Sequence, residues 1–268
     1  MTKSVVFFDL DGTLLRDDKT VGSTAIAAIS ELRQQGSLPV ISTGRDLWEI
    51  QDFMQTTGID SAVCGNGATL LINGQVVDKR HIQQNLVAAI NTRAAADDLT
   101  VAWYNENGAA LSRADDLTIG NYQDVRQTPP PVAADYWRTH PSTRMLVFTG
   151  EAQAVQLQEQ YSTDFPELAF YHSSPFDLEL IEKRISKESG IRAMRTLPEL
   201  AEATAYAFGD GDNDVPMSRA VDHMVAMANA SGQLHDIAYY TTGDNNGDGI
   251  AQGLRHFNLN CIRKGVVT

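Results

Sequence analysis

A buried strand runs directly into two carboxylates in the stretch SVVFFDLDGT, residues 4–13. Residues 4–8 are mostly β-branched or aromatic and show no polar alternation, which is typical of a strand buried on both faces. Asp9 and Asp11 lie two residues apart, so their side chains share one side if the strand geometry continues. Gly12 permits a tight turn whose N–H groups could hold an anion. The plainer alternative is a strand followed by an Asp-Gly turn.

Strands and helices alternate around this stretch. The sequence predicts helices over 23–35 and 47–54, strands over 38–41 and 62–64, and a hairpin of 68–72 and 75–77 around Asn73-Gly74. The alternation returns late in the chain, with helices over 191–197 and 216–220 and strands over 205–208 and 224–227. Repeated strand–helix–strand units imply a parallel sheet with right-handed crossovers.

The rhythm differs in the middle of the chain. The pattern there predicts helices over 86–96 and 152–161 and strands over 101–104, 144–148, 168–171 and 178–181, with an extended proline loop at 127–131. We therefore predict an α/β fold. A Rossmann-like, mostly parallel sheet core is formed by residues 1–82 and 186–268, and an α+β domain is inserted at 83–185.

A second carboxylate cluster follows another apolar strand in the stretch YAFGDGDND, residues 206–214. Three aspartates within five residues, Asp210, Asp212 and Asp214, repel one another unless a cation neutralises them. Carboxylate oxygens are hard ligands that suit Mg²⁺ or Ca²⁺. The alternative is a solvated acidic loop.

Two weaker signals lie between these stretches. Ser42-Thr43-Gly44-Arg45 ends the second predicted strand, and Lys187 lies where the first rhythm resumes. Taken alone, the first segment fits a helix N-cap and the second a surface lysine.

Composition limits the classes of function. The chain has 268 residues, with Lys and Arg 21 against Asp and Glu 34, a formal net charge of −13. This charge disfavours nucleic acid and anionic membranes as partners. No stretch reaches the ~18 apolar residues of a membrane span, which excludes a membrane ion pump. The short apolar run before Asp9 does not resemble a secretory signal, so we expect a cytoplasmic protein. Cys64 and Cys261 match no metal or redox spacing and are expected to be unpaired.

The four polar segments, in this order, resemble the four motifs of the haloacid dehalogenase-like (HAD) superfamily of phosphohydrolases. Asp-x-Asp-Gly-Thr at 9–13 and Gly-Asp-x-x-Asn-Asp at 209–214 are the specific ones. The insertion that follows the loop Gly65-Asn66-Gly67-Ala68 resembles the Cof-type branch, which has a large α/β cap. The likeness covers nearly the whole chain.

The resemblance implies a Mg²⁺-dependent phosphatase that hydrolyses a small phosphomonoester, such as a sugar phosphate or another phosphorylated metabolite, through an aspartyl phosphate. It implies Asp9 as the nucleophile and Asp11 as the general acid and then the general base. Thr43 and Lys187 would hold the phosphoryl oxygens. The implied Mg²⁺ ligands and supports are Asp9, the Asp11 carbonyl, Asp210 and Asp214. The implied lining of the phosphate pocket is Gly12, Thr13, Gly44, Arg45, Asn66 and Asn213.

The acid role requires a proton on Asp11 when substrate binds, so we expect its pKa nearer neutral than that of an exposed aspartate. Two positions depart from the family pattern. Lys187 is followed by Glu188-Ser189 where the family has glycine, which leaves Lys183 as the fallback. Asp212 is an additional acid, expected in solvent, with metal contact as the alternative.

Other residues give weaker signals. The segment 244–249 resembles the start of an EF-hand loop, but its twelfth position is Arg255 rather than Glu, so we expect a helix N-terminus at Asp248 instead. The residues of the inserted domain that could face a substrate, or else be ordinary strand-surface residues, are Tyr104, Asn105, His172, Asp177 and Glu179. The residues expected in packing rather than stacking are Trp48, Trp103 and Trp137.

Two other functions remain open. The same scaffold could serve a phosphomutase or phosphotransferase, which passes the phosphoryl group to a second hydroxyl. A non-catalytic metabolite sensor could use the same pocket, although it would not need Asp11. The sequence indicates neither the physiological substrate nor the oligomeric state.

Overall fold

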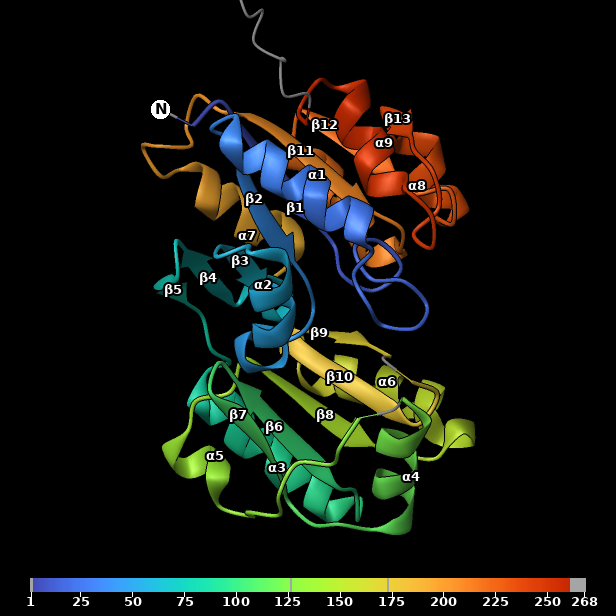
Figure 1. Cartoon of the computed structure of the whole chain (residues 1–268). Helices are drawn as coiled ribbons and strands as arrows, with labels where there is room; N and C mark the ends of the chain where they lie inside the picture. The colour runs from blue at the N-terminus through green and yellow to red at the C-terminus, as the bar shows by residue number, and fades with distance from the viewer. Residues whose placement is uncertain (1, 126, 173, 261–268) are drawn as a thin grey trace, which may run out of the picture. The chain divides into compact units, whose positions relative to one another are not determined.

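The computed structural model describes residues 2–125, 127–172 and 174–260 (Figure 1). Within these residues the chain forms two compact units. The first, called the core unit below, contains the residues up to Lys79 and again from Ser186. The second, called the inserted unit, runs from Arg80 to Ile185. Each unit has a sheet of its own, and Ile82 already packs in the apolar core of the inserted unit.

The core unit is built on an eight-stranded sheet with the order β13-β12-β11-β1-β2-β3-β4-β5. Its strands are β1 (Ser4–Phe8), β2 (Leu38–Ser42), β3 (Ala62–Cys64), β4 (Thr69–Ile72), β5 (Gln75–Lys79), β11 (Thr204–Gly209), β12 (His223–Ala226) and β13 (Tyr240–Thr241). Neighbouring strands are parallel from β13 to β3, whereas β4 and β5 join antiparallel. The predicted α/β fold with a mostly parallel sheet is confirmed.

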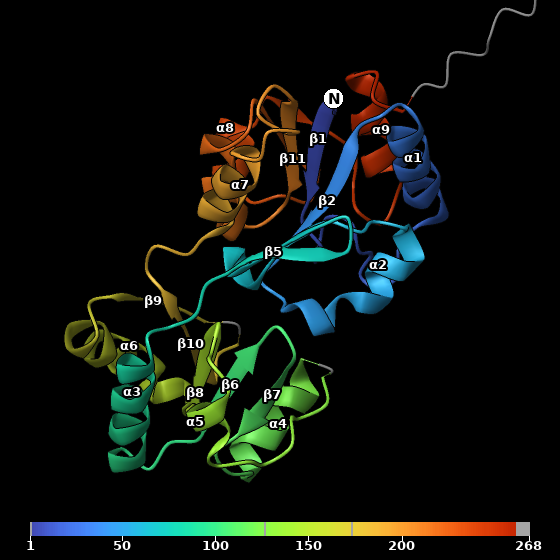
Figure 2. The same ribbon diagram turned by 90° about the vertical axis from the view of Figure 1, so that its left-hand side faces the viewer.

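Helices cover both faces of this sheet. They are α1 (Ser23–Gln34), α2 (Gln51–Thr57), α7 (Lys187–Arg195), α8 (Gly232–Ile237) and α9 (Gly249–His256), with 3₁₀ helices η1 (Leu47–Glu49), η2 (Gly65–Gly67) and η3 (Asp212–Arg219). Figure 2 shows α1 and α9 on one side of β1 and β11, and α7 and α8 on the other. Val6 and Phe8 pack in the cluster of α1 and α9, while Val5 and Phe7 pack in that of α7 and α8. Both faces of β1 are therefore buried, which explains its lack of polar alternation.

The predicted hairpin is present, whereas two predicted helices differ from the structure. The hairpin between β4 and β5 turns at Asn73 and Gly74, whose φ values of 48° and 76° fit the turn type that Asn-Gly favours. The helix predicted over 47–54 is divided, because η1 ends at Glu49 and α2 begins at Gln51. The helix predicted over 216–220 belongs to η3, where Pro216 lacks the N–H that an α-helix would use.

The inserted unit has a five-stranded antiparallel sheet with the order β7-β6-β8-β10-β9. Its elements are α3 (Gln84–Ala96), β6 (Val101–Asn105), β7 (Gly108–Leu111), α4 (Asp116–Asp124), α5 (Tyr136–Thr139), β8 (Arg144–Phe148), α6 (Glu151–Asp164), β9 (Leu168–Tyr171) and β10 (Asp177–Glu182). One face packs against α3 and α6 through Trp103, Ile90 and Tyr161. Trp103 is buried as expected, whereas Trp48 of the core unit is 37% exposed and is not a core packing residue.

One of the two cysteines lies in the described part of the chain. Cys64 is buried and unpaired, and Cys261 lies outside the described residues. None of the helices in the described part of the chain combines the length and apolar character that crossing a membrane would require.

Helix α4 depends on the N-cap residue Asp115. Its Oδ1 accepts hydrogen bonds from the N–H and the hydroxyl of Thr118, at 2.8 and 2.7 Å, and its Oδ2 accepts one from the hydroxyl of Thr100 at 2.5 Å. Burial would raise the pKa of Asp115, but these hydrogen bonds outweigh it and lower the pKa to about 2. The folded unit therefore favours the ionised cap.

Asp115→Ala should destabilise the protein by ~1 kcal/mol at neutral pH, because the cap bonds to Thr118 are lost. The pKa of Asp115 is lower in the folded than in the unfolded protein. The stabilisation is therefore fully present above about pH 4 and is lost as the pH falls toward 2. Urea unfolding of both proteins at several pH values checks this. Asp116→Ala, one residue further on and exposed, is the control. If the difference in the free energy of unfolding between the native and Asp115→Ala proteins does not shrink on acidification, the assignment of Asp115 as an ionised N-cap is contradicted.

Candidate active site

Polar residues follow three neighbouring strands of the core sheet at their carboxyl ends. Asp9 comes directly after β1, Thr43 after β2 and Asp210 after β11, and β1 pairs in parallel with both of the other strands. Parallel neighbours end at one edge of the sheet, so these side chains gather there. This edge is where open α/β sheets bind ligands.

Three carboxylates meet at this edge. Asp9, Asp210 and Asp214 each offer one oxygen, and these oxygens all lie within 4.8 Å of one another. Asp9 is 6% and Asp214 0% exposed, so water screens their repulsion poorly. Such a set of hard oxygen donors fits a divalent cation such as Mg²⁺. Asp212 is exposed and lies outside the cluster found among the described residues.

Lys187 places a cation inside this cluster. It is the first residue of α7, only 2% exposed, and its Nζ donates to Asp9 Oδ1 and Asp214 Oδ1, both at 2.6 Å. Burial would lower the pKa of Lys187, but Asp214 and Asp9 outweigh it and raise the pKa above its usual value. The fallback Lys183 instead donates to the Pro166 carbonyl at 3.5 Å within the inserted unit.

Repulsion among the buried carboxylates is only partly neutralised by Lys187. Burial first, and then the charge of Asp214, raises the pKa of Asp9, and Lys187 offsets only part of this. Burial and Asp214 likewise raise the pKa of Asp210 to about 6, against the hydrogen bond from Thr13. A bound divalent cation would reverse both shifts, because it favours the ionised carboxylates.

Asp214 supports the loop as well as the lysine. Its Oδ2 accepts hydrogen bonds from the N–H groups of Asp210 and Gly211, at 3.0 and 3.1 Å, while its Oδ1 faces Lys187. A Cβ at Gly209 would lie 2.7 Å from Asp214, so the backbone can approach only because residue 209 is glycine. Both oxygens of Asp214 are thus engaged with the chain itself.

Asp11 lies outside the cluster and is bound by two cations. Arg45 donates through Nε to Asp11 Oδ2 at 2.9 Å and through Nη2 to Oδ1 at 2.7 Å, and Lys19 Nζ donates to Oδ1 at 2.8 Å. Burial would raise the pKa of Asp11, but Arg45 and Lys19 outweigh it and the pKa is lowered. The expected pKa nearer neutral is wrong for this arrangement. Arg45, expected to line the phosphate pocket, is here the partner of Asp11.

Gly12 and Thr13 both lie against Asp210 of the carboxylate cluster. Thr13 is fully buried, and its hydroxyl donates to Asp210 Oδ1 at 3.0 Å. Gly12 has a φ of 81°, and a Cβ there would lie 2.2 Å from Asp210 Oδ2. Any other residue would collide with the carboxylate, so the glycine is required by close approach as well as by the turn.

The remaining pocket candidates divide into two groups. Thr43 is 2% exposed, and its Oγ1 accepts the N–H of Arg45 at 3.1 Å. Asn66 lies against Gly44, since a Cβ at Gly44 would be 3.3 Å from the Asn66 amide. Asn213, by contrast, is exposed on η3, and its side chain lies over Gly211.

Candidates in the inserted unit already have partners there. His172 contacts the carbonyl of Asp177 at 2.6 Å and the Gln158 side chain at 2.7 Å. The side chain of Asn105 donates to the Tyr136 hydroxyl at 3.0 Å. These contacts fit ordinary structural positions.

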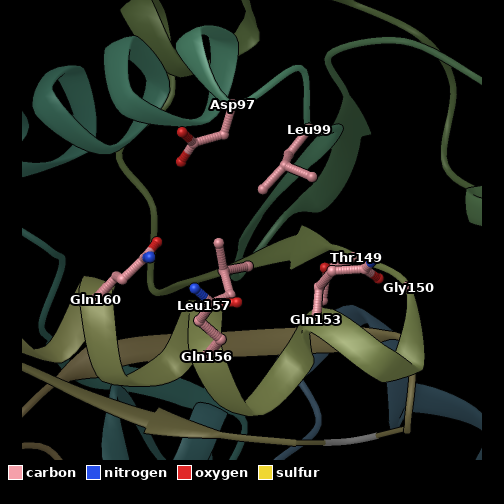
Figure 3. A pocket seen from close by; sticks show the side chains of 8 residues that line it. All are labelled: Asp97, Leu99, Thr149, Gly150, Gln153, Gln156, Leu157 and Gln160. Atoms are coloured by element: carbon pink, nitrogen blue, oxygen red, sulfur yellow. The ribbon is translucent and has the colours of Figure 1, made fainter.

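A pocket of about 400 Å³ lies in the inserted unit (Figure 3). Side chains from the end of α3 and from α6 line it, among them Asp97 and Gln160. Asp97 Oδ2 is already bound by Arg93 Nε at 2.7 Å and the Tyr161 hydroxyl at 3.2 Å. None of the predicted site residues lines this pocket.

Sequence reasoning missed two sets of contacts at the site. Lys19 stands in a polar segment and shows no motif, although it reaches Asp11. The segment 244–249 resembles a calcium loop, but the asparagines Asn245 and Asn246 contact the loop after β1. Helix α9 begins after Asp248, close to the helix start predicted there.

Comparison with known proteins identifies the family. The model of the haloacid dehalogenase-like hydrolases matches residues 6–254. The chain therefore belongs to this family and is a hydrolase of the HAD superfamily.

Individual relatives are similar over their whole length. A protein of Bacillus subtilis (strain 168) named "Putative phosphatase YkrA" is 26% identical, with 97% of this chain and 99% of that protein covered. A hypothetical protein from Geobacillus kaustophilus HTA426 has a TM-score of 0.90 at 28% identity, covering 96% of this chain and 99% of that one. The HAD subclass IIB sugar phosphatase BT4131 has the same fold, with a TM-score of 0.78 at 24% identity, covering 96% and 100%.

Proposed function

We propose that this protein is a Mg²⁺-dependent phosphatase that hydrolyses a small phosphomonoester through an aspartyl phosphate on Asp9. The observation that supports this best is the buried contact of Asp9 with Lys187 beside Asp210 and Asp214. A carboxylate used only to fold the sheet would not need a buried lysine and two further acids at the ligand-binding edge. The inserted unit is proposed to serve as the cap.

In the first step an Asp9 carboxylate oxygen attacks phosphorus. The bond from phosphorus to the ester oxygen breaks, and Asp11 donates its proton to the departing alcohol. Lys187 and the hydroxyl of Thr43 hold the equatorial phosphoryl oxygens, where negative charge is spread in the transition state. The product of this step is the phosphorylated Asp9 and the free alcohol.

In the second step a water molecule attacks the phosphorylated Asp9. Asp11 takes the proton from this water, the bond from Asp9 to phosphorus breaks, and inorganic phosphate leaves. The two steps together regenerate the carboxylate of Asp9 and the proton on Asp11. Mg²⁺ held by Asp9, Asp210 and the Asp11 carbonyl, with Asp214 in support, would neutralise the repulsion between the carboxylate and the phosphate dianion.

The ionised state of Asp11 fits this cycle at its second step. The carboxylate paired with Arg45 and Lys19 is the form that accepts a proton from water. An entering phosphate dianion adds negative charge near Asp11 and competes for its cations, and both effects raise its pKa. Substrate binding thus favours the protonated form that the first step requires.

The substrate class is proposed to be a small phosphorylated metabolite, with a sugar phosphate foremost. The chain's negative charge disfavours polyanionic partners away from the metal site. A cap encloses small substrates and excludes water during the reaction. The sugar phosphatase among the solved structures shares the fold and agrees with this choice.

A phosphate-release screen over sugar phosphates, nucleotides and phosphorylated cofactors tests the proposal. Release should require Mg²⁺, fall by roughly 100-fold or more in EDTA, and return when Mg²⁺ is restored in excess. Turnover that persists in EDTA would contradict the metal assignment. Phosphoryl transfer only to an added acceptor would indicate a phosphotransferase, and ligand-shifted melting without any turnover would indicate a sensor.

A further inference from the structure

Asparagines from late segments of the core unit contact the loop between β1 and α1, drawn in blue in Figure 1. Asn229 Nδ2 donates to the carbonyl of Gly12 at 2.8 Å, and Asn245 Nδ2 donates to the carbonyl of Leu15 at 3.0 Å. Asn245 is 7% exposed, and its N–H donates to Asn229 Oδ1 at 3.2 Å. The two asparagines therefore act on the loop as one connected unit.

Asn246 forms a reciprocal pair with Asp17 in the same loop. The N–H of Asp17 donates to Asn246 Oδ1 and Asn246 Nδ2 donates to Asp17 Oδ2, both at 3.0 Å. Asn245 Nδ2 also lies 3.2 Å from Asp17 Oδ1. Backbone and side chain of residue 17 are thus both fixed by side-chain amides.

Lys19 connects this loop to Asp11. Lys19 lies within a tight turn, in which Arg16 N–H donates to the Thr20 carbonyl and Lys19 N–H donates to the Arg16 carbonyl, both at 2.9 Å. Lys19 has a φ of 65°, in the left-handed region that only the surrounding structure imposes on such a residue. From there its Nζ reaches Asp11 Oδ1 at 2.8 Å.

An ion pair this exposed does not hold itself in place. The Lys19 side chain is 55% exposed, and solvent screening and side-chain entropy leave such pairs weak. Residues 17–20 are all exposed, so apolar packing does not fix them either. The amides of Asn245 and Asn246 tie this segment to the rest of the core unit.

We propose that Asn245 and Asn246 are positioning residues for the reaction. Through Asp17 and the turn at 16–20 they set the place of Lys19, which together with Arg45 orients the Asp11 carboxylate. This inference rests on the proposed function, in which Asp11 transfers a proton to the departing alcohol. In this proposal the segment that resembles a calcium loop binds no calcium. Its amide side chains hold the loop that carries Lys19, and so align Asp11 as the proton donor.

Asn246→Asp tests this role, because it sets a second carboxylate against Asp17. The rate of the first step, measured as release of the free alcohol in a single turnover, should fall about 10-fold or more for a sugar phosphate, since its alkoxide needs the aligned proton donor. The first-step rate for p-nitrophenyl phosphate, whose leaving group needs little protonation, should fall less than about threefold. The double variant Asp17→Asn with Asn246→Asp restores an amide opposite a carboxylate and should recover the sugar phosphate rate. Asn73→Asp, which adds the same charge on an exposed hairpin of the core unit, is the control.

Amide hydrogen exchange over residues 12–20 gives a readout that does not depend on activity. Exchange there should accelerate in Asn246→Asp and return to the native rate in the double variant. Equal loss of the first-step rate for both esters, no recovery in the double variant, or unchanged exchange would each overturn the proposal. If the native protein hydrolyses no phosphomonoester, the proposed function itself fails. The contact between Asn246 and the loop is then supported by accelerated exchange and overturned by unchanged exchange.

Discussion

Asp9→Asn should abolish phosphate release from every ester that the native protein hydrolyses, a loss of about 10⁴-fold or more in kcat. A neutral amide cannot displace an alcohol from phosphorus, and the change also removes a charged oxygen from the proposed Mg²⁺ site. The measurement is steady-state turnover with Mg²⁺ of the preferred ester and of p-nitrophenyl phosphate. Both should fall together, because neither ester is cleaved unless its phosphoryl group is first transferred to Asp9.

The fold of Asp9→Asn should remain intact. The substitution removes one of three crowded carboxylates, and burial already raises the pKa of Asp9, so the melting temperature in EDTA should not fall. Asp212→Asn is the matched control, since Asp212 is exposed beside the cluster, and its kcat should stay within about threefold of native. Turnover by Asp9→Asn above about one hundredth of the native rate would contradict the nucleophile assignment.

Lys187→Met should damage both activity and stability. The change leaves Asp9 and Asp214 without their buried cation, and breaking such a pair costs about 3–5 kcal/mol. The kcat should also fall by roughly 100-fold or more, because a phosphoryl oxygen loses its charged donor. Urea unfolding in EDTA and in Mg²⁺ measures the first effect, and Mg²⁺ should restore part of the lost stability.

Lys183→Met controls for the removal of a lysine. Lys183 is exposed and bonds only weakly to a carbonyl, so its loss should change stability by less than about 0.5 kcal/mol. If Lys183→Met were the variant that lost activity, the third motif would be assigned to the wrong lysine. A free energy of unfolding of Lys187→Met equal to that of the native protein would contradict the buried contacts of Lys187 with Asp9 and Asp214.

The sequence predicts the core of this fold because its strongest patterns are local. The run at residues 4–8 is apolar on both faces since two helical layers cover β1, and Asn73-Gly74 encodes its own turn. The approach of Asp9 to Asp210 also follows, because parallel strands that pair as neighbours end at one edge. Strand order thus brings together segments that are far apart in the chain.

Helix α4 could not be predicted from the sequence, because its buried face is largely polar. Helix α4 buries Thr118, Asn121 and Tyr122, so hydrophobic periodicity cannot reveal it. The lowered pKa of Asp11 could not be predicted from the sequence either. Its direction depends on Arg45 from another strand end and on Lys19 from a turn with a left-handed residue, and neither contact follows from spacing.

Trapping the phosphorylated enzyme tests the central claim most directly. Native protein mixed with a radiolabelled phosphate ester and Mg²⁺, then quenched in acid during turnover, should carry label on the peptide that contains Asp9. The label should be absent from Asp9→Asn and discharged as inorganic phosphate if turnover continues before the quench. Label on another residue, or turnover of the native protein with no labelled peptide at any time point, would contradict the account.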